Sequence, residues 1–323
     1  MIIAAQNKND KDRLESSSGA IFPLIAKKII KEGGVVYGAA FNDKFEAEHI
    51  RVDNLDSLPR LYGSKYVFSN CRVYPNVRDD LEEGRIVLFT GTPCQVGGLV
   101  SFLKKDYQNL YLIDNICHGA PSAKLWEQYL RERTEGKAIS SITFRDKSKG
   151  WQHYRFVIKY KDGSEYNIDH DADLYMRGFI DNITLGDACF HCKFKGVESR
   201  QSDITLGDLW GAWVFLPEMF DDKGTSLLFV NSDKGKQLLG GIREDIVISE
   251  VDRQKAIEWN ACAVRPSKPG VFRDRFLKDY KKSDKLIPVL KKYAMPGFGL
   301  KAYRKIYNMT HKDWHGKHRK YNP

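Results

Sequence analysis

Two short apolar runs constrain the fold of this chain more than any other feature. Residues 86–89 (Ile-Val-Leu-Phe) and 110–113 (Leu-Tyr-Leu-Ile) are apolar throughout. Continuous apolar runs of this length are typical of strands buried on both faces of a parallel sheet. Residues 95–103, between them, predict the crossover helix that two parallel strands require. The sequence therefore predicts an α/β sheet, a fold whose ligands bind at the carboxyl ends of the strands.

The rest of the chain first continues this pattern and then changes it. A helix is expected over residues 21–30, with Ser17 or Ser18 as its N-cap. From residue 139 to residue 168 the chain alternates like antiparallel strands. The predicted fold class is α/β, with a mixed or mostly parallel sheet flanked by helices, followed by an α+β region and a basic helical C-terminal tail. The three regions are expected at residues 1–135, 136–280 and 281–323.

Four of the six cysteines lie in loops that suit a binding site. Cys94 and Cys117 each follow one of the apolar runs, and Cys189 and Cys192 form a C-x-x-C pair. Four thiolates are a ligand set for a [4Fe–4S] cluster or for a structural zinc ion. Zinc ribbons commonly have two C-x-x-C pairs, so one pair with two single cysteines favours a cluster, although spacing alone does not decide.

The other two cysteines, Cys71 and Cys262, have no comparable loop context. We expect them to be buried free thiols that lie apart from the four. His118 and His191 flank candidate ligands, where an imidazole can hydrogen bond to a cluster or carry a proton. Loop histidines without a chemical role are the alternative.

Three loops with glycine are candidates for binding a cofactor. Residues 16–19 (Ser-Ser-Ser-Gly) precede the predicted helix, where free N–H groups attract a phosphate, and an ordinary helix cap is the alternative. Residues 63–66 (Gly-Ser-Lys-Tyr) offer a turn with a cation and a ring, and the alternative for Lys65 is a solvated surface lysine. Residues 90–93 (Thr-Gly-Thr-Pro) end a buried strand and are the stronger candidate. Residues 203–211 carry two aspartates and a tryptophan that either cover a cofactor ring or belong to the core.

The formal net charge of +10 is concentrated at the C-terminal end. Residues 281–323 contain twelve Lys or Arg and two acidic residues, whereas the rest of the chain has 40 of each sign. The body therefore shows no nucleic-acid footprint. The tail suits docking to an anionic membrane surface or an acidic partner, and a helix pair packed on the body is the alternative. Its cations alternate with Leu286, Ile287, Val289, Leu290, Tyr293, Phe298, Leu300, Tyr303, Ile306, Tyr307 and Trp314.

The expected location is the cytoplasm. No stretch reaches the roughly 18 apolar residues that a membrane span needs, and the N-terminus lacks the pattern of a signal peptide. The cysteines are then expected to be reduced or metal-bound and not disulfide-linked. Peripheral contact with the inner membrane surface is one option for the tail.

In this order, the motifs resemble the coenzyme F-420 hydrogenase/dehydrogenase beta-subunit family, in the bacterial branch often found near polysaccharide genes. The resemblance covers the chain from about residue 3 to about residue 270. Together the motifs are highly specific, although several are weak singly. They are residues 16–19, 63–66, 88–95, 116–122, 144–151, 189–194 and 204–211.

The resemblance implies an iron–sulfur flavoprotein oxidoreductase. Hydride or electrons would pass between FAD, one [4Fe–4S] cluster and a small-molecule redox substrate. The implied catalytic residues are His118 and Lys65, with Lys65 near the phosphates or the ring. The implied cluster ligands are Cys94, Cys117, Cys189 and Cys192. The implied flavin-binding residues are Ser17, Ser18, Gly19, Gly63, Ser64, Lys65, Tyr66, Thr90, Gly91 and Thr92.

The chain departs from the family in two places. Fuller members carry an N-terminal ferredoxin-like segment, whereas no cysteine precedes Cys71 here. We therefore expect a separate ferredoxin or other redox partner, and the alternative is that this sequence starts late. The first loop usually reads Ser-Ser-Gly-Gly, and Ala20 stands in its last place. The alternative function is a non-catalytic protein of polysaccharide or envelope metabolism that keeps the fold with a structural metal site. A nucleotide-sugar or glycan-processing enzyme without a redox step is a third.

Overall fold

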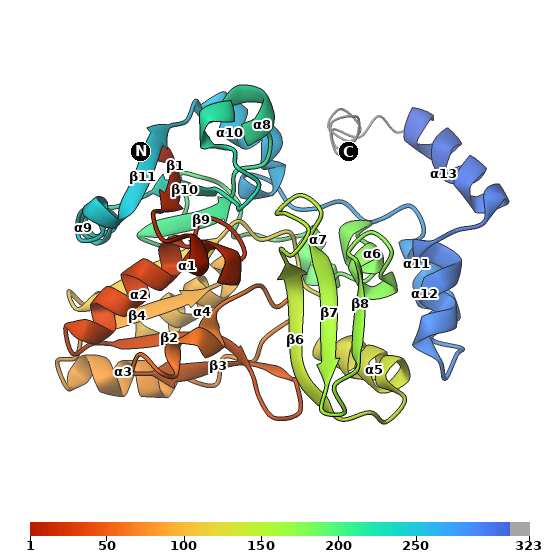
Figure 1. Cartoon of the computed structure of the whole chain (residues 1–323), viewed down its shortest axis with the longest axis horizontal. Helices are drawn as coiled ribbons and strands as arrows, with labels where there is room; N and C mark the ends of the chain where they lie inside the picture. The colour runs from red at the N-terminus through yellow and green to blue at the C-terminus, as the bar shows by residue number, and fades with distance from the viewer. Residues whose placement is uncertain (311–323) are drawn as a thin grey trace.

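The computed structural model describes residues 1–310, and an eight-stranded mixed sheet forms its larger half (Figure 1). The strands lie in the order β11-β1-β10-β9-β5-β4-β2-β3. Four neighbours, β9, β5, β4 and β2, run parallel, and every other pairing in this sheet is antiparallel. The strands are β1 Ile2–Asn7, β2 Val35–Phe41, β3 Ala47–Val52, β4 Val87–Gly91, β5 Leu110–Asn115, β9 Ile204–Asp208, β10 Ser226–Val230 and β11 Ile246–Glu250.

The parallel strands are buried on both faces, because alternate side chains point to opposite sides of a sheet. Val36 and Leu88 pack with α2 and α9 on one face. Val87 and Phe89 pack with α3 and α4 on the other face. This double coverage explains why the strands are continuously apolar. The covering helices are α2 Ile21–Lys31, α3 Tyr74–Glu82, α4 Pro93–Leu103 and α9 Asp233–Gly240.

A smaller antiparallel sheet of order β6-β7-β8 lies beside the main sheet (Figure 1). It packs against helices through an aromatic core that includes Trp126, Phe144, Phe156 and Tyr175. Large aromatic side chains dominate the burial in such a core. The elements of this part are β6 Ile139–Asp146, β7 Arg155–Tyr160, β8 Glu165–Asp169, α5 Ala123–Thr134, α6 Leu174–Ile180, α11 Arg273–Tyr280 and α12 Leu286–Ala294.

Short helices complete the described chain. None of its helices is long and apolar enough to cross a membrane. The remaining α-helices are α1 Asp10–Glu15, α7 Asp187–Phe190, α8 Ala212–Phe215, α10 Arg253–Trp259 and α13 Phe298–Thr310. Single 3-10 turns are η1 Leu58–Leu61, η2 Pro217–Met219, η3 Arg243–Asp245 and η4 Ala261–Ala263.

The α/β fold class, with an α+β region and C-terminal helices after it, is confirmed. The main sheet nevertheless takes strands from both sides of the boundary expected at residue 135. β9, β10 and β11 come from the later region, and β1 lies between β10 and β11. The division into a flavin-binding and a cluster-binding region remains a prediction.

The expected tail covers residues 281–323. Its first part, which contains α12, belongs to the body of the protein. In α12, Leu286 and Leu290 are fully buried, and Tyr293 is nearly so. The carboxylate of Glu132 on α5 accepts hydrogen bonds from the N–H groups of Leu286 and Ile287 at 2.6 and 2.8 Å. These bonds satisfy donors that a helix start leaves free. The packed-helix alternative therefore holds for α12.

The second part of the expected tail is more exposed. Phe298, at the start of α13, is 90% exposed. The guanidinium of Arg304 lies 2.9 Å from the carboxylate of Asp181, which ties α13 to the end of α6. The side chains of Ile306 and Tyr307, and the whole of Trp314, lie outside the described part, so docking by this segment remains a prediction.

Candidate functional site

Two of the four candidate ligands lie at the same edge of the main sheet. β4 and β5 are parallel neighbours, so the loops that follow them leave the sheet on the same side. Cys94 lies in the first turn of α4, and Cys117 follows β5 by two residues. Cys189 lies in α7, and Cys192 follows that helix. All four are free thiols.

Two glycines allow the C-x-x-C loop to approach this edge. A Cβ atom at Gly97, on α4, would overlap the ring of Phe194, which follows Cys192. A Cβ atom at Gly119 would lie 3.3 Å from the Cβ of Cys189. The loop after β5 and the N-terminal half of α4 are thus both in contact with the segment that carries the C-x-x-C pair. We call Cys94, Cys117, Cys189 and Cys192 the cysteine site.

The electrostatics of the thiols agree with this proximity. Burial, and then the thiols of Cys94 and Cys189, raise the pKa of Cys117 to about 12, although the charge of Lys195 opposes them. Burial also raises the pKa of Cys94, and Cys192 and Cys189 add to the effect. Thiols so placed do not ionise together unless a cation joins them.

Four thiols are a donor set for either a [4Fe–4S] cluster or a zinc ion. Within residues 1–310, no group of three or more His, Cys, Asp or Glu is arranged to hold one metal ion. Zinc binds sulfur at about 2.3 Å, which draws four thiolates close together. The cysteines of a [4Fe–4S] cluster each bind a different iron and therefore lie further apart. Lys195 adds a positive charge, since its Nζ donates to the carbonyl of Cys117 and, at 2.9 Å, to that of Cys262.

The expectation that Cys71 and Cys262 lie apart from this site is wrong. The Sγ of Cys262 lies 3.6 Å from Nδ1 of His118, whose Nε2 lies 2.5 Å from Oδ1 of Asn182. Burial raises the pKa of Cys262, but the hydrogen bond and charge of His118 outweigh it and lower that pKa to about 7. The Sγ of Cys71 lies 3.2 Å from Nδ1 of His49. Cys71 also interacts electrostatically with Cys94. Cys262 is therefore linked to Cys117 through His118 and Lys195, and Cys71 lies near Cys94.

We call the three expected flavin loops, residues 16–19, 63–66 and 90–92, the loop site. Two of them meet directly, because Ser17 Oγ lies 2.7 Å from Ser64 Oγ. Ser18 Oγ donates to the carbonyl of Thr225 at 2.7 Å. The N-cap of α2 is Ala20, and it has no side-chain cap bond. The prediction that Ser17 or Ser18 caps this helix is therefore wrong, because both hydroxyls bind other segments.

The residues around Ser17 are fixed by packing. A Cβ atom at Gly19 would overlap the carbonyl of Ala5, and the N–H of Gly19 donates to Ser226 Oγ at 3.0 Å. Gly19 thus lets the loop pack on β1 and β10. Ala20 has a φ of +60°, a conformation that favours glycine. Ser16 Oγ is buried and has no hydrogen-bond partner in the described structure.

Lys65 is held by its own turn and is not a solvated surface lysine. Its Nζ donates to the carbonyls of Tyr62 at 2.9 Å and Arg60 at 3.2 Å. Gly63 has a φ of +74°, which permits this turn. Burial lowers the pKa of Lys65 to about 7. The amine can therefore exchange a proton near neutral pH.

The third loop, residues 90–92, lies next to the cysteine site. Thr92 is the N-cap of α4 in a capping box, and its Oγ1 lies 3.1 Å from the Sγ of Cys94. Nε2 of His49 lies 3.0 Å from the carbonyl of Thr90 and fills the space beside Gly91. The loop after β4 therefore leads directly to Cys94 of the cysteine site.

Phe179, on α6, makes a second connection between the two sites. Its ring stacks on Tyr66 of the loop site, with the ring centroids 4.7 Å apart. The same ring meets His118, beside Cys117, edge to face at 5.0 Å. The loop site and the cysteine site are therefore joined by Thr92 on one side and by Phe179 on the other.

Sequence reasoning gave no role to Arg145, which flanks the loop site. Arg145 is 6% exposed, and its Nη1 donates to the carboxylate of Asp208. Nε1 of Trp151 donates to the carbonyl of Ser17 at 3.2 Å, and the rings of Trp151 and Trp210 lie 4.6 Å apart. The signal for Arg145 and Trp151 was their place in the matched stretch 144–151, whereas Asp208 and Trp210 were already candidates to cover a cofactor ring.

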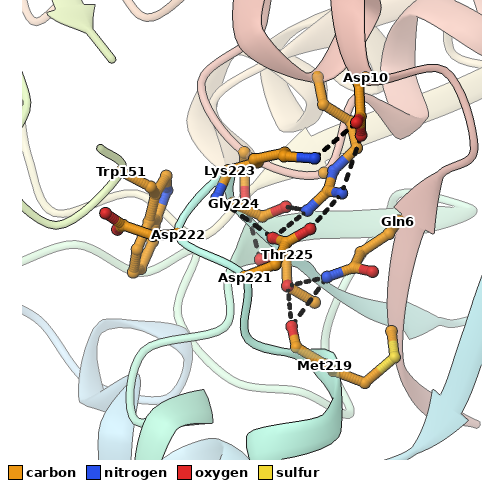
Figure 2. Close-up of polar contacts among 12 residues, drawn as sticks. Gln6, Asp10, Trp151, Met219, Asp221, Asp222, Lys223, Gly224 and Thr225 are labelled. Atoms are coloured by element: carbon orange, nitrogen blue, oxygen red, sulfur yellow. Dashed lines mark hydrogen bonds and ion pairs between the residues drawn. The ribbon is translucent and has the colours of Figure 1, made fainter. Parts of the chain in front are cut away.

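Loop 16–19 packs on a segment that is held by a polar network. Figure 2 shows this network around Asp221, Gly224 and Thr225. The guanidinium of Arg13 donates twice to the carboxylate of Asp221, at 2.6 and 2.7 Å, and to the carbonyl of Gly224 at 2.9 Å. Nε2 of Gln6 donates to Thr225 Oγ1 at 2.7 Å. The bidentate pair fixes the geometry of the segment on which the loop rests.

Comparisons with known proteins agree with this fold. Residues 84–255, more than half of the chain, match the family described as the C terminus of the beta subunit of coenzyme F420 hydrogenase/dehydrogenase. The fold is similar to that of a chain in the F420-reducing [NiFe] hydrogenase complex from Methanosarcina barkeri, with a TM-score of 0.53 and 14% identity over 93% of this chain and 94% of that one. Identity this low indicates a shared fold only. A search of curated proteins finds no match. By the family match, this chain belongs to the coenzyme F420 hydrogenase/dehydrogenase beta-subunit family.

Proposed function

We propose that the chain is an oxidoreductase that depends on FAD and one [4Fe–4S] cluster and acts on a small organic redox substrate. Family membership supports a redox role at a coarse level. The observation that carries the finer proposal is the contact between the cysteine site and the loop site. Thr92 Oγ1 is 3.1 Å from Cys94 Sγ, and Phe179 packs between Tyr66 and His118. An electron carrier and a hydride carrier must lie near each other in this chemistry.

Cys94, Cys117, Cys189 and Cys192 would hold the cluster. Four thiols are the donor set that a [4Fe–4S] cluster requires. The Lys195 charge lowers the pKa of Cys117 against the effect of burial, so it favours the thiolate that binds iron. Gly97 and Gly119 provide the space in which Phe194 and Cys189 approach.

The loop site would hold the flavin. Ser17 and Ser64 place two hydroxyls within 2.7 Å of each other, and the buried Oγ of Ser16 has no partner among the described residues. Unpaired buried hydroxyls are costly and suit a ligand that supplies the missing bond. When bound, FAD exchanges two electrons with an organic substrate and single electrons with a cluster. Tyr66 and Thr92 would then separate the ring from the cysteine site.

Two side chains are placed to hold or move a proton. Burial lowers the pKa of Lys65 to about 7, so its Nζ can be neutral or charged near physiological pH. Nδ1 of His118 faces Cys262, and its Nε2 is held by Asn182. Lys65 would serve the substrate side, and His118 the side of Cys117.

A separate ferredoxin or similar acidic redox protein would exchange electrons with the cluster. The cations of α13, and those that follow it in the sequence, suit such a partner, and an anionic membrane surface is the other surface that they suit. A place in polysaccharide or envelope metabolism is part of the same proposal.

The test is anaerobic purification followed by iron, sulfide and flavin analysis and a visible spectrum. The proposal predicts about four irons and four sulfides per chain, one FAD, and a brown-yellow protein. A colourless protein that holds one zinc ion and takes up no FAD would support the structural-metal alternative. A protein with FAD but no iron would retain the flavoprotein and exclude the cluster.

A further inference from the structure

Arg145 has two donors that the described protein does not use. Its guanidinium lies at the end of β6, the residue is only 6% exposed, and Nη1 is bonded to Asp208. Nε and Nη2 are buried and have no hydrogen-bond partner among the described residues. An unpaired donor on a buried charge is destabilising, because the group has lost its bonds to water and gained none in the protein. A charged side chain with two unused donors is a common mark of a ligand site.

Aromatic rings surround this guanidinium. Its Cζ atom lies 4.7 Å from the ring centroid of Tyr154, 5.4 Å from that of Trp151 and 5.8 Å from that of Trp210. Ring faces attract the charge as a whole. They do not replace an acceptor atom for Nε–H and Nη2–H. The rings therefore explain how the charge is kept in place, and leave the two donors available.

The neighbours of Arg145 belong to the loop site. Trp151 donates to the carbonyl of Ser17. Phe144, the residue before Arg145, packs edge to face on Tyr66 at 5.5 Å. Arg145 is thus connected on one side to residues 16–19 and on the other to residues 63–66. It contributes a charge from the small sheet to loops of the main sheet.

We infer that Arg145 binds the pyrimidine edge of the flavin ring, with Nε and Nη2 donating to ring acceptor atoms. The inference rests on the proposed function. A guanidinium is planar and presents paired donors, which suits two acceptors side by side on a flat ring. Trp151 and Trp210 suit a planar ring more than a phosphate. Phosphates are better served by the helix starts of the main sheet.

The position of this charge has a consequence for the flavin. Two-electron reduction adds two electrons and one proton to the ring, and the resulting negative charge lies on the pyrimidine side. A fixed guanidinium at that edge binds the reduced ring more tightly than the oxidised ring. Arg145 therefore raises the midpoint potential, in addition to strengthening binding.

The test compares Arg145→Met with Arg200→Met in the full chain. Arg200 is a matched control, because its side chain is 3% exposed and pairs with the buried Asp114, while its three nitrogens all have protein partners. Flavin fluorescence gives the Kd for FAD and for riboflavin, and spectroelectrochemistry gives the midpoint potential. The double variant Arg145→Met/Asp208→Asn removes both charges, in case the single variant leaves Asp208 unpaired and does not fold.

We expect Arg145→Met and the double variant to bind both FAD and riboflavin about tenfold more weakly, because the contact is to the ring. The midpoint potential should fall by about 30 mV, which corresponds to a tenfold change for a two-electron couple. Arg145→Lys should retain the potential and lose affinity. Arg200→Met should change neither.

Two results would overturn the inference. One is a loss of affinity for FAD with none for riboflavin, which would place Arg145 at the phosphates. The other is an unchanged potential in folded Arg145→Met and double variants. If the wild-type chain itself binds no flavin, the proposed function fails first, and this distinguishes the two failures.

Discussion

The cysteine site and the loop site lie at the same sheet edge but are built in different ways. The cysteine site uses one uncommon residue type, delivered by three loops, and its members raise one another's pKa. The loop site uses serine, lysine and threonine, whose roles depend on what surrounds them. Ser17 meets Ser64, and Ser18 is tied to Thr225.

This contrast determines how each kind of site can be recognised. A thiol in a loop after a buried strand has few ordinary uses, so the residue type itself carries the information. A serine before a helix has a common use as a cap, and only the structure shows that Ser17 and Ser18 do something else. We therefore expect the cysteine site to lose iron when one cysteine is replaced. We expect the loop site to lose flavin when the residues that hold its loops in place are replaced.

The largest expected effect tests the cysteine site alone. Cys117→Ser should lower bound iron and sulfide about tenfold or more after anaerobic reconstitution, while flavin content stays close to that of the wild type. Metal analysis and the visible spectrum measure both on one sample. Cys71→Ser is the control and should retain its iron, because His49 and Ser69 hold Cys71. Full iron content in Cys117→Ser would contradict the ligand assignment.

The next prediction disturbs one support of each site. Gly97→Val should push on Phe194 and lower iron content, whereas Gly19→Val should push on the carbonyl of Ala5 and lower flavin content. Each substitution should destabilise the fold by about 1–3 kcal/mol, with Gly19→Val at the upper end because backbone cannot move aside as a ring can. Chemical denaturation gives the stability. Loss of the same cofactor in both variants would mean that the two sites are one cooperative unit.

A third prediction concerns how stability depends on pH through Lys147, whose Nζ lies 3.4 Å from the carbonyl of Ser18 in the loop site. Burial, with Arg145 nearby, lowers the pKa of Lys147 to about 7, and its Nζ donates to the carbonyls of Arg13 and Lys223. Between pH 7 and the ordinary lysine pKa, the unfolded chain binds a proton that the folded chain does not, so the free energy of unfolding rises with pH. This contribution is at most about 1.4 kcal/mol per pH unit.

The check is to measure unfolding of the wild type and Lys147→Met from pH 7 to pH 9. The two proteins share every other charged group, so the difference between the two curves reports on Lys147 together with its interactions with Asp208, Asp221, Arg13 and Arg145. The stability of the wild type should rise relative to that of the variant across this range. Parallel curves would show that Lys147 stays charged when folded.

The smallest expected effect is at Ala20. Its φ of +60° costs an alanine more than a glycine, so Ala20→Gly should stabilise the protein by about 1 kcal/mol. Ala26, in the middle of α2, is the matched control, because it is buried in a helical conformation. Ala26→Gly should destabilise by about 1 kcal/mol. Destabilisation by both substitutions would show that the left-handed turn is not strained.

The sequence predicts the parallel core well, because Val87 and Phe89 and their neighbours must be apolar on both faces. It does not predict that β1 pairs with β10 and β11, since pairings across more than two hundred residues leave no local pattern. For the same reason the boundary at residue 135 does not divide the main sheet.

Within the candidate site, the four cysteines could be found from their loops, and Arg145 could not. Nothing in a lone arginine of a predicted strand shows that Asp208 will pair with it or that Nε and Nη2 will lack partners. The neighbourhoods of Cys71 and Cys262 were missed because their partners, His49 and His118, are distant in sequence. The proximity of such groups is a tertiary property.

The position of β1 has a consequence for the order of assembly on the ribosome. β1 is synthesised long before its two neighbours, β10 and β11, which end at residues 230 and 250. Loop 16–19 rests on the same late segment, through Thr225 and Ser226. β1 must therefore stay unpaired until residues 226–250 have been synthesised, which slows folding and leaves an unpaired strand edge that can aggregate. Loop 16–19, which we propose binds flavin, would reach its binding conformation only after residues 225 and 226 have been synthesised. A nascent chain shorter than this would therefore not bind the cofactor.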